Sequence, residues 1–402
     1  MSATSKSGQR LSLLSLIFGA LIALPTQRMW IRSHALWMFT WIVQSIATEF
    51  SLLGVVMGAL GILRGAGKTR WMSATGTVLA ARPLYQAVRL ARRLDSAMRE
   101  GLGNDYAKCI PAAMRCRMAP TPLSLETMLQ GFPKGDVQEY HDVPYRTVDG
   151  QTLLLDVYEP PDYLPELLSS GRPAVIAVHG GSWHHSDKGM PFDAHWRWLA
   201  GQGYVVFDIQ YRLSPAARFP EHLEDVKAAV RWVRANAARY RVDPARIALH
   251  GRSAGAHLVL LAAYTAENKS AAVQAVVAAY PPTDLLLWPA MKDSPLDTFL
   301  GGLPEDIPDR YHEASPVNHT HPHVPPTLLF QGQQDSLVPP NHAEALYNRL
   351  RILGIPAVLL RLPWSRHAFD ASMKGYGGQI AQFYTDRFLA WSLYGQGHCE
   401  SA

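Results

Sequence analysis

Residues 250–257, HGRSAGAH, contain the pattern Gly-X-Ser-X-Gly with Ser253 at its centre. They lie between a predicted strand, 247–250, and a helix predicted to begin near Ala254. A strand that turns sharply into a helix holds the central residue in a strained conformation and exposes its side chain. The positive end of the helix also favours a developing oxyanion. We therefore expect Ser253 to act as a nucleophile.

A nucleophilic serine needs a base, and the base needs an acid that orients it. After a Gly-X-Ser-X-Gly turn, the expected chain order is serine, acid, histidine. Asp335 lies just after the predicted strand 327–330, and His367 lies just after the predicted strand 357–362. Both loops should reach the sheet edge that holds Ser253, so we expect Asp335 and His367 to complete a catalytic triad.

Other residues compete for these two supporting roles. Asp284 follows the predicted strand that ends at Tyr280 and is an alternative acid, while His184 and His185 are alternative bases. The less suitable candidates are Asp370, which is too close to His367 in the chain, His250, which lies beneath the serine turn, and His398, which lies in a polar tail.

Two adjacent glycines, Gly180 and Gly181, follow the apolar run 174–179. An ester carbonyl attacked by serine becomes an oxyanion, which needs two or three N–H donors. Glycine suits such a place because a side chain would block the approach of the substrate. We expect the N–H groups of Gly180, Gly181 and Ala254 to form an oxyanion hole. The alternative is that the two glycines form only a tight turn.

The elements that would position this site alternate between strand-like and helix-like patterns. Residues 143–160 form two strand-like runs around Asp149-Gly150, which indicates a hairpin. The other predicted strands are 174–179, 204–209, 247–250, 273–280, 327–330 and 357–362, and the predicted helices include 221–240, 343–353 and 379–393. This alternation predicts an α/β fold with a mostly parallel central sheet flanked by helices. Residues 287–325 interrupt the pattern and are predicted to form a cap-like insertion.

Several of these motifs together carry a family resemblance. The segments HGGSW, YRL, FPEHLEDVKAAVRWV, GRSAG, GQQDSLVP and RHAF occur in this order. Residues 143–393 resemble the α/β-hydrolase esterases, in particular the carboxylesterase branch with hormone-sensitive-lipase-like and BD-FAE-like enzymes. The resemblance implies the triad Ser253, Asp335 and His367, the oxyanion hole Gly180, Gly181 and Ala254, and a structural signature at Tyr211, Arg212 and Asp225.

The chain departs from this family pattern at two places that bear on the substrate. Ser182 and Ala368 each stand where glycine is usual in the family. Neither change removes a catalytic group, but both alter the shape of the pocket, for which Trp183 and Tyr211 are candidate lining residues. The resemblance implies no metal and no cofactor. The sequence also contains no cluster of cysteine and histidine residues that would suggest a metal site.

The N-terminal quarter has a different character. Residues 1–110 carry 13 Lys/Arg and 4 Asp/Glu, a net charge of 13 − 4 = +9, in a chain whose total is +5. Residues 11–24 contain no charged residue, and residues 35–63 contain only one, Glu49. Basic residues interleaved with apolar runs do not fit nucleic-acid binding. We expect a membrane-associated helical region with candidate spans at 11–24 and 35–63.

Alternatives remain for this region. Residues 11–24 could be the core of a signal peptide, and residues 35–63 could be a buried helical hairpin. Basic residues after the second run favour a cytoplasmic catalytic domain. Glu49 would be either paired or near the membrane surface. Cys109 and Cys116 could pair in an oxidising compartment.

The sequence thus predicts three parts: a membrane-associated region 1–110, a linker 111–138 and an α/β-hydrolase domain 139–395. We predict a serine carboxylic-ester hydrolase that acts on lipid-like or medium-chain esters. An acyltransferase with the same triad and a non-catalytic binding protein are the alternatives. The predicted partners are an ester or lipid substrate and the membrane, with no nucleic acid.

Overall fold

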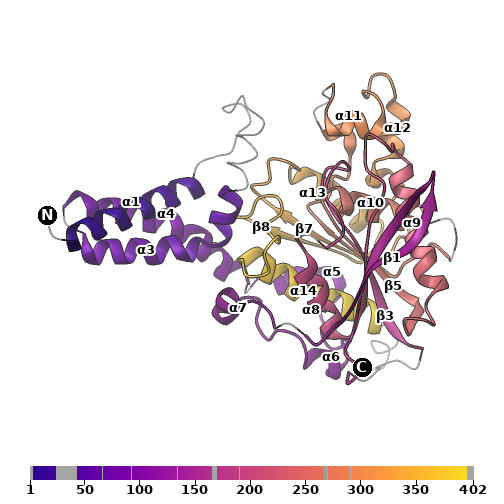
Figure 1. Cartoon of the computed structure of the whole chain (residues 1–402), viewed down its shortest axis with the longest axis horizontal. Helices are drawn as coiled ribbons and strands as arrows, with labels where there is room; N and C mark the ends of the chain where they lie inside the picture. Colours follow the sequence, from indigo (N-terminus) through magenta and orange to yellow (C-terminus); the bar gives the residue numbers. More distant parts are fainter. Residues whose placement is uncertain are drawn as a thin grey trace.

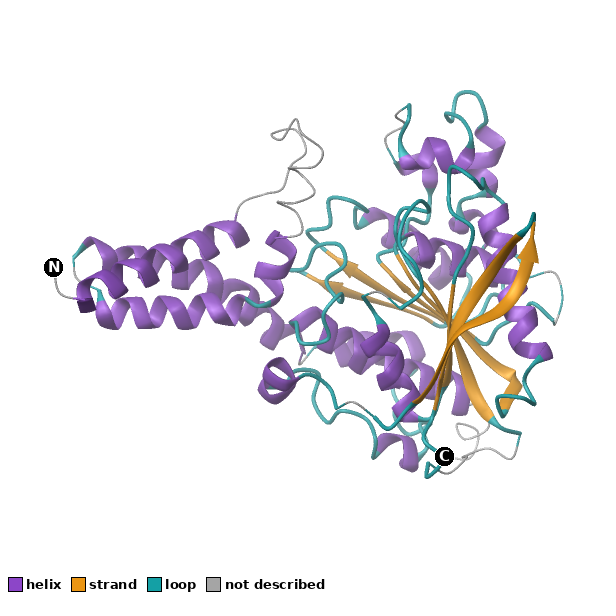
Figure 2. Ribbon diagram, in the orientation of Figure 1, coloured by secondary structure: helices purple, strands orange, loops and turns teal. Residues whose placement is uncertain are grey.

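The computed structural model describes residues 3–23, 43–65, 67–91, 93–133, 135–164, 170–189, 191–266, 268, 270–288 and 292–395. Its centre is an eight-stranded sheet with the strand order β1-β2-β4-β3-β5-β6-β7-β8 (Figures 1 and 2). The strands are β1 (Gln138–Val148), β2 (Gln151–Glu159), β3 (Arg172–Val178), β4 (Val205–Ile209), β5 (Val242–Arg252), β6 (Ala275–Ala279), β7 (Thr327–Gly332) and β8 (Ala357–Leu362). Only β2 pairs antiparallel, with β1 and β4, and the other neighbours are parallel. The predicted mostly parallel sheet is confirmed.

Helices cover both faces of this sheet, because successive side chains of a strand point to opposite sides. In β3, Ile176 and Val178 belong to a core shared with α9, α10 and α13, whereas Val175 and Ala177 belong to a core shared with α8 and α14. These helices are α8 (Asp193–Gln202), α9 (Glu221–Ala235), α10 (Ala254–Tyr264), α13 (Asn341–Ile352) and α14 (Tyr376–Tyr394). Burial on both faces explains why the strands are continuous apolar runs.

The predicted hairpin at Asp149-Gly150 is confirmed. β1 and β2 pair up to Val148 and Gln151, and the two residues between them have φ values of 52° and 76°. A two-residue turn with positive φ at both positions matches the twist of the flanking strands, which is why Asp-Gly is favoured there.

The insertion 287–325 forms short helices that lie above α10 in Figure 1. The 3-10 helix η2 (Leu285–Leu287) leads into the insertion, which contains α11 (Pro295–Leu300), α12 (Pro308–Glu313) and the 3-10 helix η3 (Pro316–His319). The ring of Phe299 stacks on Trp183 at a centroid distance of 4.4 Å. The carbonyl oxygen of Ala314 lies 2.7 Å from Nε2 of His257. These contacts tie the insertion to the loop after β3 and to α10, and its role as a cap stays a prediction.

Three N-terminal helices lie side by side and project from one side of the α/β domain (Figures 1 and 2). They are α1 (Ala3–Ala23), α3 (Ser51–Arg64) and α4 (Lys68–Ala91). We call them the three-helix bundle. The chain then continues through α5 (Leu94–Leu102), α6 (Ala112–Arg115) and α7 (Leu125–Gln130) before β1.

The structure does not support the two predicted membrane spans. Within the described ranges, no single helix is long and apolar enough to cross a bilayer, and only Val43–Glu49 together with α3 meets that condition across a bend of 74°. This bend breaks the apolar run 35–63 into short helices. Residues 24–42, which include the start of that run, lie outside the described residues.

The segment after α4 packs into the α/β domain. Leu94, Met98, Tyr106 and Met114 are buried in the core on the α8 and α14 side of the sheet. The predicted boundaries at 110 and 138 stay predictions, although core packing begins before either of them. Cys109 is disulfide-bonded and Cys116 is a free, exposed thiol, so the two cysteines do not pair with each other.

Candidate active site

Ser253 stands at the sharp turn between β5 and α10. Its backbone has φ 53° and ψ −121°, a strained conformation for a residue with a side chain. A Cβ on Gly251 would clash with the carbonyl oxygen of Gly255, and a Cβ on Gly255 would clash with the carbonyl oxygens of Val178 and His179. Both glycines of the motif are therefore required by space, which is the reason the sequence uses them around this serine.

The structure brings Ser253, His367 and Asp335 together. Nε2 of His367 lies 2.8 Å from the hydroxyl oxygen of Ser253, and Nδ1 lies 2.7 Å from a carboxylate oxygen of Asp335. The other oxygen of Asp335 accepts hydrogen bonds of 2.9 Å from the N–H groups of Leu337 and Val338. The carboxylate is buried and its orientation is fixed by these amides, so it in turn fixes the imidazole.

Parallel strands explain how three loops so far apart in the chain converge. β5, β7 and β8 end at the same edge of the sheet, and the three residues follow these ends. The ring of Tyr280, just beyond β6, packs against His367 at a centroid distance of 4.4 Å. Ala368 has φ 53°, which explains why glycine is usual there in the family that the sequence resembles.

The loop after β3 lies beside the serine. A Cβ on Gly180 would come within 2.9 Å of the carbonyl oxygen of Arg252 and 3.2 Å of Cβ of Ser253. Gly181 has φ 113°, and a Cβ there would clash with the carbonyl oxygen of His185. Close approach of other backbone atoms thus requires glycine at both positions, and the backbone conformation requires it at Gly181 as well.

Tyr211 and Trp183, the two predicted pocket residues, are buried and hold this loop. The hydroxyl of Tyr211 donates to the carbonyl oxygen of His179 at 3.2 Å, and its ring stacks on His179 at 4.3 Å. Nε1 of Trp183 donates to Nδ1 of His257 at 3.3 Å. These contacts give both residues a supporting position, and whether they also line the pocket stays a prediction.

The alternative acid and bases lie in other surroundings. Asp284 accepts a hydrogen bond from the N–H of Leu286 at the start of η2. Nδ1 of His184 lies 2.8 Å from the carbonyl oxygen of Ser182 in its own loop. His185 is exposed, His250 is buried against Trp196, and His398 lies outside the described residues.

Asp370 belongs to a buried network that sequence analysis missed. Its carboxylate accepts hydrogen bonds from Nε of Arg252 at 2.6 Å and from the hydroxyl of Tyr280 at 2.7 Å. Burial acts to raise the pKa of Asp370, but the positive charge of Arg252, the nearby His195 and the hydrogen bonds from Tyr280 and Arg252 together lower this pKa. The network joins the residue before Ser253 to the loop that carries His367. Arg252 is visible in the sequence motif, but no local pattern indicates its partner.

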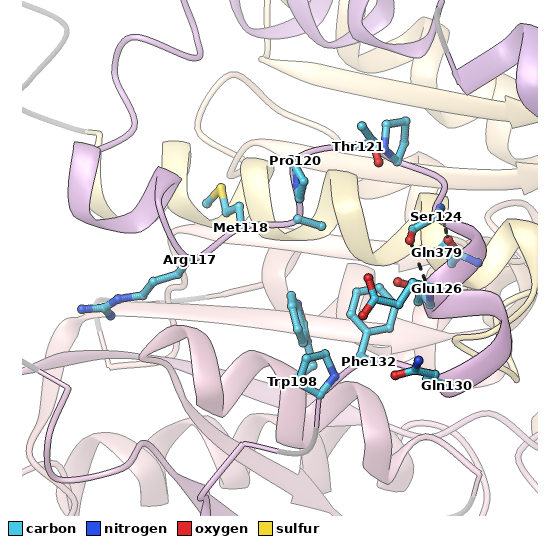
Figure 3. Close-up of a pocket in the computed structure, with 15 residues that line it drawn as sticks. Arg117, Met118, Pro120, Thr121, Ser124, Glu126, Gln130, Phe132, Trp198 and Gln379 are labelled. Carbon is cyan, nitrogen blue, oxygen red and sulfur yellow. Dashed lines mark hydrogen bonds between the residues drawn. The ribbon is translucent and has the colours of Figure 1, made fainter.

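A cavity of about 680 Å³ lies elsewhere, between the segment 117–133 and helices α8 and α14 (Figure 3). The rings of Phe132 and Trp198 meet edge to face at 4.5 Å, and the N–H of Ser124 donates to Gln379 at 2.8 Å. None of the three residues that converge at Ser253 lines this cavity. Across the described part of the chain, no group of three or more His, Cys, Asp or Glu residues could hold a metal ion.

Comparisons with known proteins find esterases among the relatives of this chain. Residues 155–350 match the BD-FAE family model. The chain is 29% identical to the probable carboxylic ester hydrolase LipM of Mycobacterium tuberculosis, over 90% of this chain and 89% of that protein. It is 33% identical to esterase LipQ of the same organism, over 63% of this chain and 62% of that protein.

The fold is shared with solved esterases. A truncated carbohydrate esterase from gut microbiota aligns with 62% of this chain and 96% of its own chain, with a TM-score of 0.53 and 26% sequence identity. The aligned share corresponds in extent to the catalytic domain, whereas the match to LipM also includes most of the N-terminal quarter. The sheet and these likenesses together identify the chain as a carboxylic ester hydrolase with the α/β-hydrolase fold.

Proposed function

We propose that this esterase works through an acyl-enzyme intermediate on Ser253, with His367 as the base and Asp335 as the orienting acid. The observation that carries the proposal is the chain of two hydrogen bonds, 2.8 and 2.7 Å, that joins the three side chains in this order. A nucleophile bonded to a base, which is itself bonded to an orienting carboxylate, is the arrangement that acyl transfer by serine requires.

The steps follow from these contacts. The hydroxyl oxygen of Ser253 attacks the acyl carbon of the ester, and its proton passes to Nε2 of His367. Asp335 stabilises the imidazolium through Nδ1. His367 then gives the proton to the leaving alcohol oxygen, and the acyl group remains on Ser253. A water molecule then attacks the acyl carbon while His367 takes its proton. His367 returns this proton to the oxygen of Ser253 as the bond between that oxygen and the acyl carbon breaks, which releases the carboxylic acid and restores the free enzyme.

The oxyanion of each tetrahedral intermediate is stabilised by the backbone N–H groups of Gly180, Gly181 and Ala254. Two observations support this assignment. The backbone of Gly180 lies against Ser253, and Ala254 is the first residue of α10, where N–H groups have no partner within the helix. Removal of one such donor costs about 10²- to 10³-fold in turnover in other enzymes.

The test is hydrolysis of p-nitrophenyl esters by the full chain and by Ser253→Ala. We expect the variant to lose activity by several orders of magnitude, because nucleophile removal in a serine triad costs on the order of 10⁶-fold. A fluorophosphonate probe should label the native protein and leave Ser253→Ala unlabelled. Ser96→Ala, which changes an exposed serine of α5, is the matched control. Equal hydrolysis by all three proteins would overturn the assignment.

We further propose lipid-like or medium-chain esters as substrates. In support, η2 follows β6, which lies between the strands that end near Ser253 and Asp335, and it exposes the side chains of Leu286 and Leu287. Exposed apolar side chains at this edge suit an acyl chain. A rate profile against acyl length should therefore have its maximum above acetate. A rate that falls steadily from acetate upward would contradict the substrate class.

The three-helix bundle supports a membrane location for the enzyme, because small residues face its interior and many large apolar side chains face outward. Gly54, Gly58 and Gly61 of α3 face inward, and a Cβ on any of them would clash with side chains of α1 or α4. Ser73 donates a hydrogen bond of 2.8 Å to Ser12 inside the bundle. Ile22 is buried inside the bundle, but many other large apolar side chains point outward: Leu13, Leu14, Ile17, Leu53, Val56, Leu60, Leu63, Trp71 and Val78 are exposed.

Small residues inside and large apolar residues outside are the pattern of helices that pack in lipid. Basic residues suit an anionic lipid surface, and Arg10, Arg64, Lys68 and Arg70 stand at or near the end of the bundle far from the catalytic domain. The uncharged stretch of α3 is about 20 Å long at 1.5 Å per residue, less than the hydrocarbon thickness of about 30 Å. We therefore propose that the outer faces of the bundle contact membrane lipid, without assigning a full crossing.

Flotation with vesicles tests this location. The full chain should float with vesicles that contain phosphatidylglycerol, and a Leu53→Ser, Val56→Ser, Leu60→Ser variant should float less. Ile352→Ser, which changes an even more exposed apolar residue of α13 in the catalytic domain, is the control and should float as the native chain does. A native chain that stays out of the vesicle fraction would refute the proposal.

A further inference from the structure

Glu49 is a buried carboxylate whose partners lie in the catalytic domain. It ends the short helix Val43–Glu49, just before the 74° bend into α3, and its residue exposure is 4%. One carboxylate oxygen accepts a hydrogen bond of 2.7 Å from the hydroxyl of Ser365, and the other accepts one of 2.5 Å from the N–H of Gly377. Ser365 is two residues before His367, and Gly377 lies in the first turn of α14.

The contacts around Glu49 form a tight junction. The hydroxyl of Tyr376 accepts a hydrogen bond of 3.0 Å from the N–H of Leu52 and lies 3.4 Å from the hydroxyl of Ser51. A Cβ on Gly375 would come within 3.0 Å of Cβ of Glu49, and one on Gly377 within 3.1 Å of its carboxylate. The glycines at the start of α14 therefore allow the Glu49 side chain to pack closely against the helix backbone. This close packing leaves the carboxylate little room to move.

Ser365 connects this junction to the other catalytic loop as well. Its carbonyl oxygen accepts a hydrogen bond of 3.0 Å from the N–H of Gln334, the residue before Asp335. A Cβ on Gly332 would come within 2.5 Å of the same carbonyl oxygen. A shift of Ser365 would thus disturb both His367 and the Asp335 loop.

We infer that Glu49 is a positioning residue, which holds the loop 365–367 so that His367 faces Ser253 and thereby makes turnover depend on the seating of the N-terminal segment. The inference rests on the proposed roles of Ser253 and His367. The geometry has one direct route: Glu49 binds Ser365, Ser365 fixes the loop, and the loop carries the imidazole 2.8 Å from the serine oxygen.

The charged and polar groups that face Glu49 come from two elements. On the loop after β8, Asp370 repels a charged Glu49, while the hydroxyl of Ser365 donates a hydrogen bond to it. On α14, Gly377 donates to it and Tyr376 is the nearby titratable group. Burial raises the pKa of Glu49 to about 7, and these hydrogen bonds act in the opposite direction. Both carboxylate oxygens serve as acceptors, which an amide cannot reproduce because its NH₂ group donates.

The test measures kcat and KM of Glu49→Gln and Glu49→Ala with a short, water-soluble p-nitrophenyl ester. We expect kcat to fall about 10-fold for glutamine and on the order of 10²-fold for alanine, since a misplacement of about 1 Å costs this much. KM should change less than twofold, because Glu49 does not touch the substrate. Asp386→Asn alters a different buried carboxylate, which lies on α14 and bonds to Trp198 and Gln382, and it should leave kcat unchanged.

Ser365→Ala supplies the second arm. If Glu49 acts through Ser365, the double variant with Glu49→Gln should be no slower than the slower single variant, because residues that share one contact are not additive. Unchanged kcat in folded Glu49→Ala, together with an inactive Ser253→Ala, would overturn the positioning role alone. Activity retained by Ser253→Ala would instead overturn the proposed function.

Discussion

The buried ion pair of Arg252 and Asp370 makes a sharp prediction about stability. Nε of Arg252 lies 2.6 Å from the carboxylate, and the two side chains are 3% and 2% exposed. Asp370→Asn keeps the shape of the side chain and removes its charge, so it leaves a buried guanidinium without a counter-ion. The loss of one partner of a buried pair typically costs about 3–5 kcal/mol of the free energy of unfolding.

The structure places this variant near the lower end of that range. The guanidinium of Arg252 also lies 3.9 Å from the ring centroid of Phe192 and 4.8 Å from that of Trp196, and both rings attract a cation. The asparagine oxygen can still accept the hydrogen bond from Arg252. We therefore expect a loss of about 3 kcal/mol.

Denaturant unfolding at pH 7, followed by tryptophan fluorescence, measures this difference. Asp105→Asn is the control, because Asp105 forms an exposed pair with Lys108 and its loss should have no measurable effect. The folded pKa of Asp370 is lowered, so its stabilisation is present above the unfolded pKa and disappears as the pH falls through the folded pKa. A variant as stable as the native chain at pH 7 would refute the reasoning.

Three further predictions address the site and its pH dependence. Asp335→Asn should lower kcat by about 10⁴-fold, as loss of the orienting acid does in a related triad, whereas Asp284→Asn should leave p-nitrophenyl ester hydrolysis unchanged. Gly181→Ala should lower kcat at least 10²-fold through its clash with His185, while Gly201→Ala, where a Cβ meets open space, should be active. Burial raises the pKa of Asp386 to about 7, so the native protein loses stability as the pH rises from about 4 to 7, by roughly 1.4 kcal/mol per pH unit from this group. Asp386→Asn should lack this part of the fall in denaturant titrations, and parallel curves would contradict it.

The catalytic edge could be predicted from the sequence because its signals are local. The turn at Ser253 needs small neighbours that the motif supplies, and the strands before Asp335 and His367 are short apolar runs bounded by polar loops. In a parallel sheet, the carboxyl ends of such strands lie at one edge whatever the loop lengths. The order of the motifs therefore sufficed to bring the three residues together before any distance was known.

Contacts between distant segments could not be predicted in the same way. Arg252 and Asp370 are 118 residues apart, and Glu49 and Ser365 are 316 residues apart. No periodicity or motif relates such positions, so the sequence indicated only that Glu49 needed a partner or a polar surface. The partner of Glu49 is set by how the N-terminal segment packs on α14. That packing depends on the whole domain and leaves no local pattern in the sequence.

The three-helix bundle shows why an apolar run alone does not determine how a helix packs. Residues 51–63 have high hydropathy, yet the two faces of α3 differ. Gly54, Gly58 and Gly61 lie on the buried face, and Leu53, Val56, Leu60 and Leu63 are exposed. In water, the larger apolar face would be buried and the small residues exposed. The reverse arrangement suits the lipid surroundings proposed above, because burial of glycine and serine removes little apolar area from water. The packing inside the bundle thus carries more information about its surroundings than the length of the apolar run does.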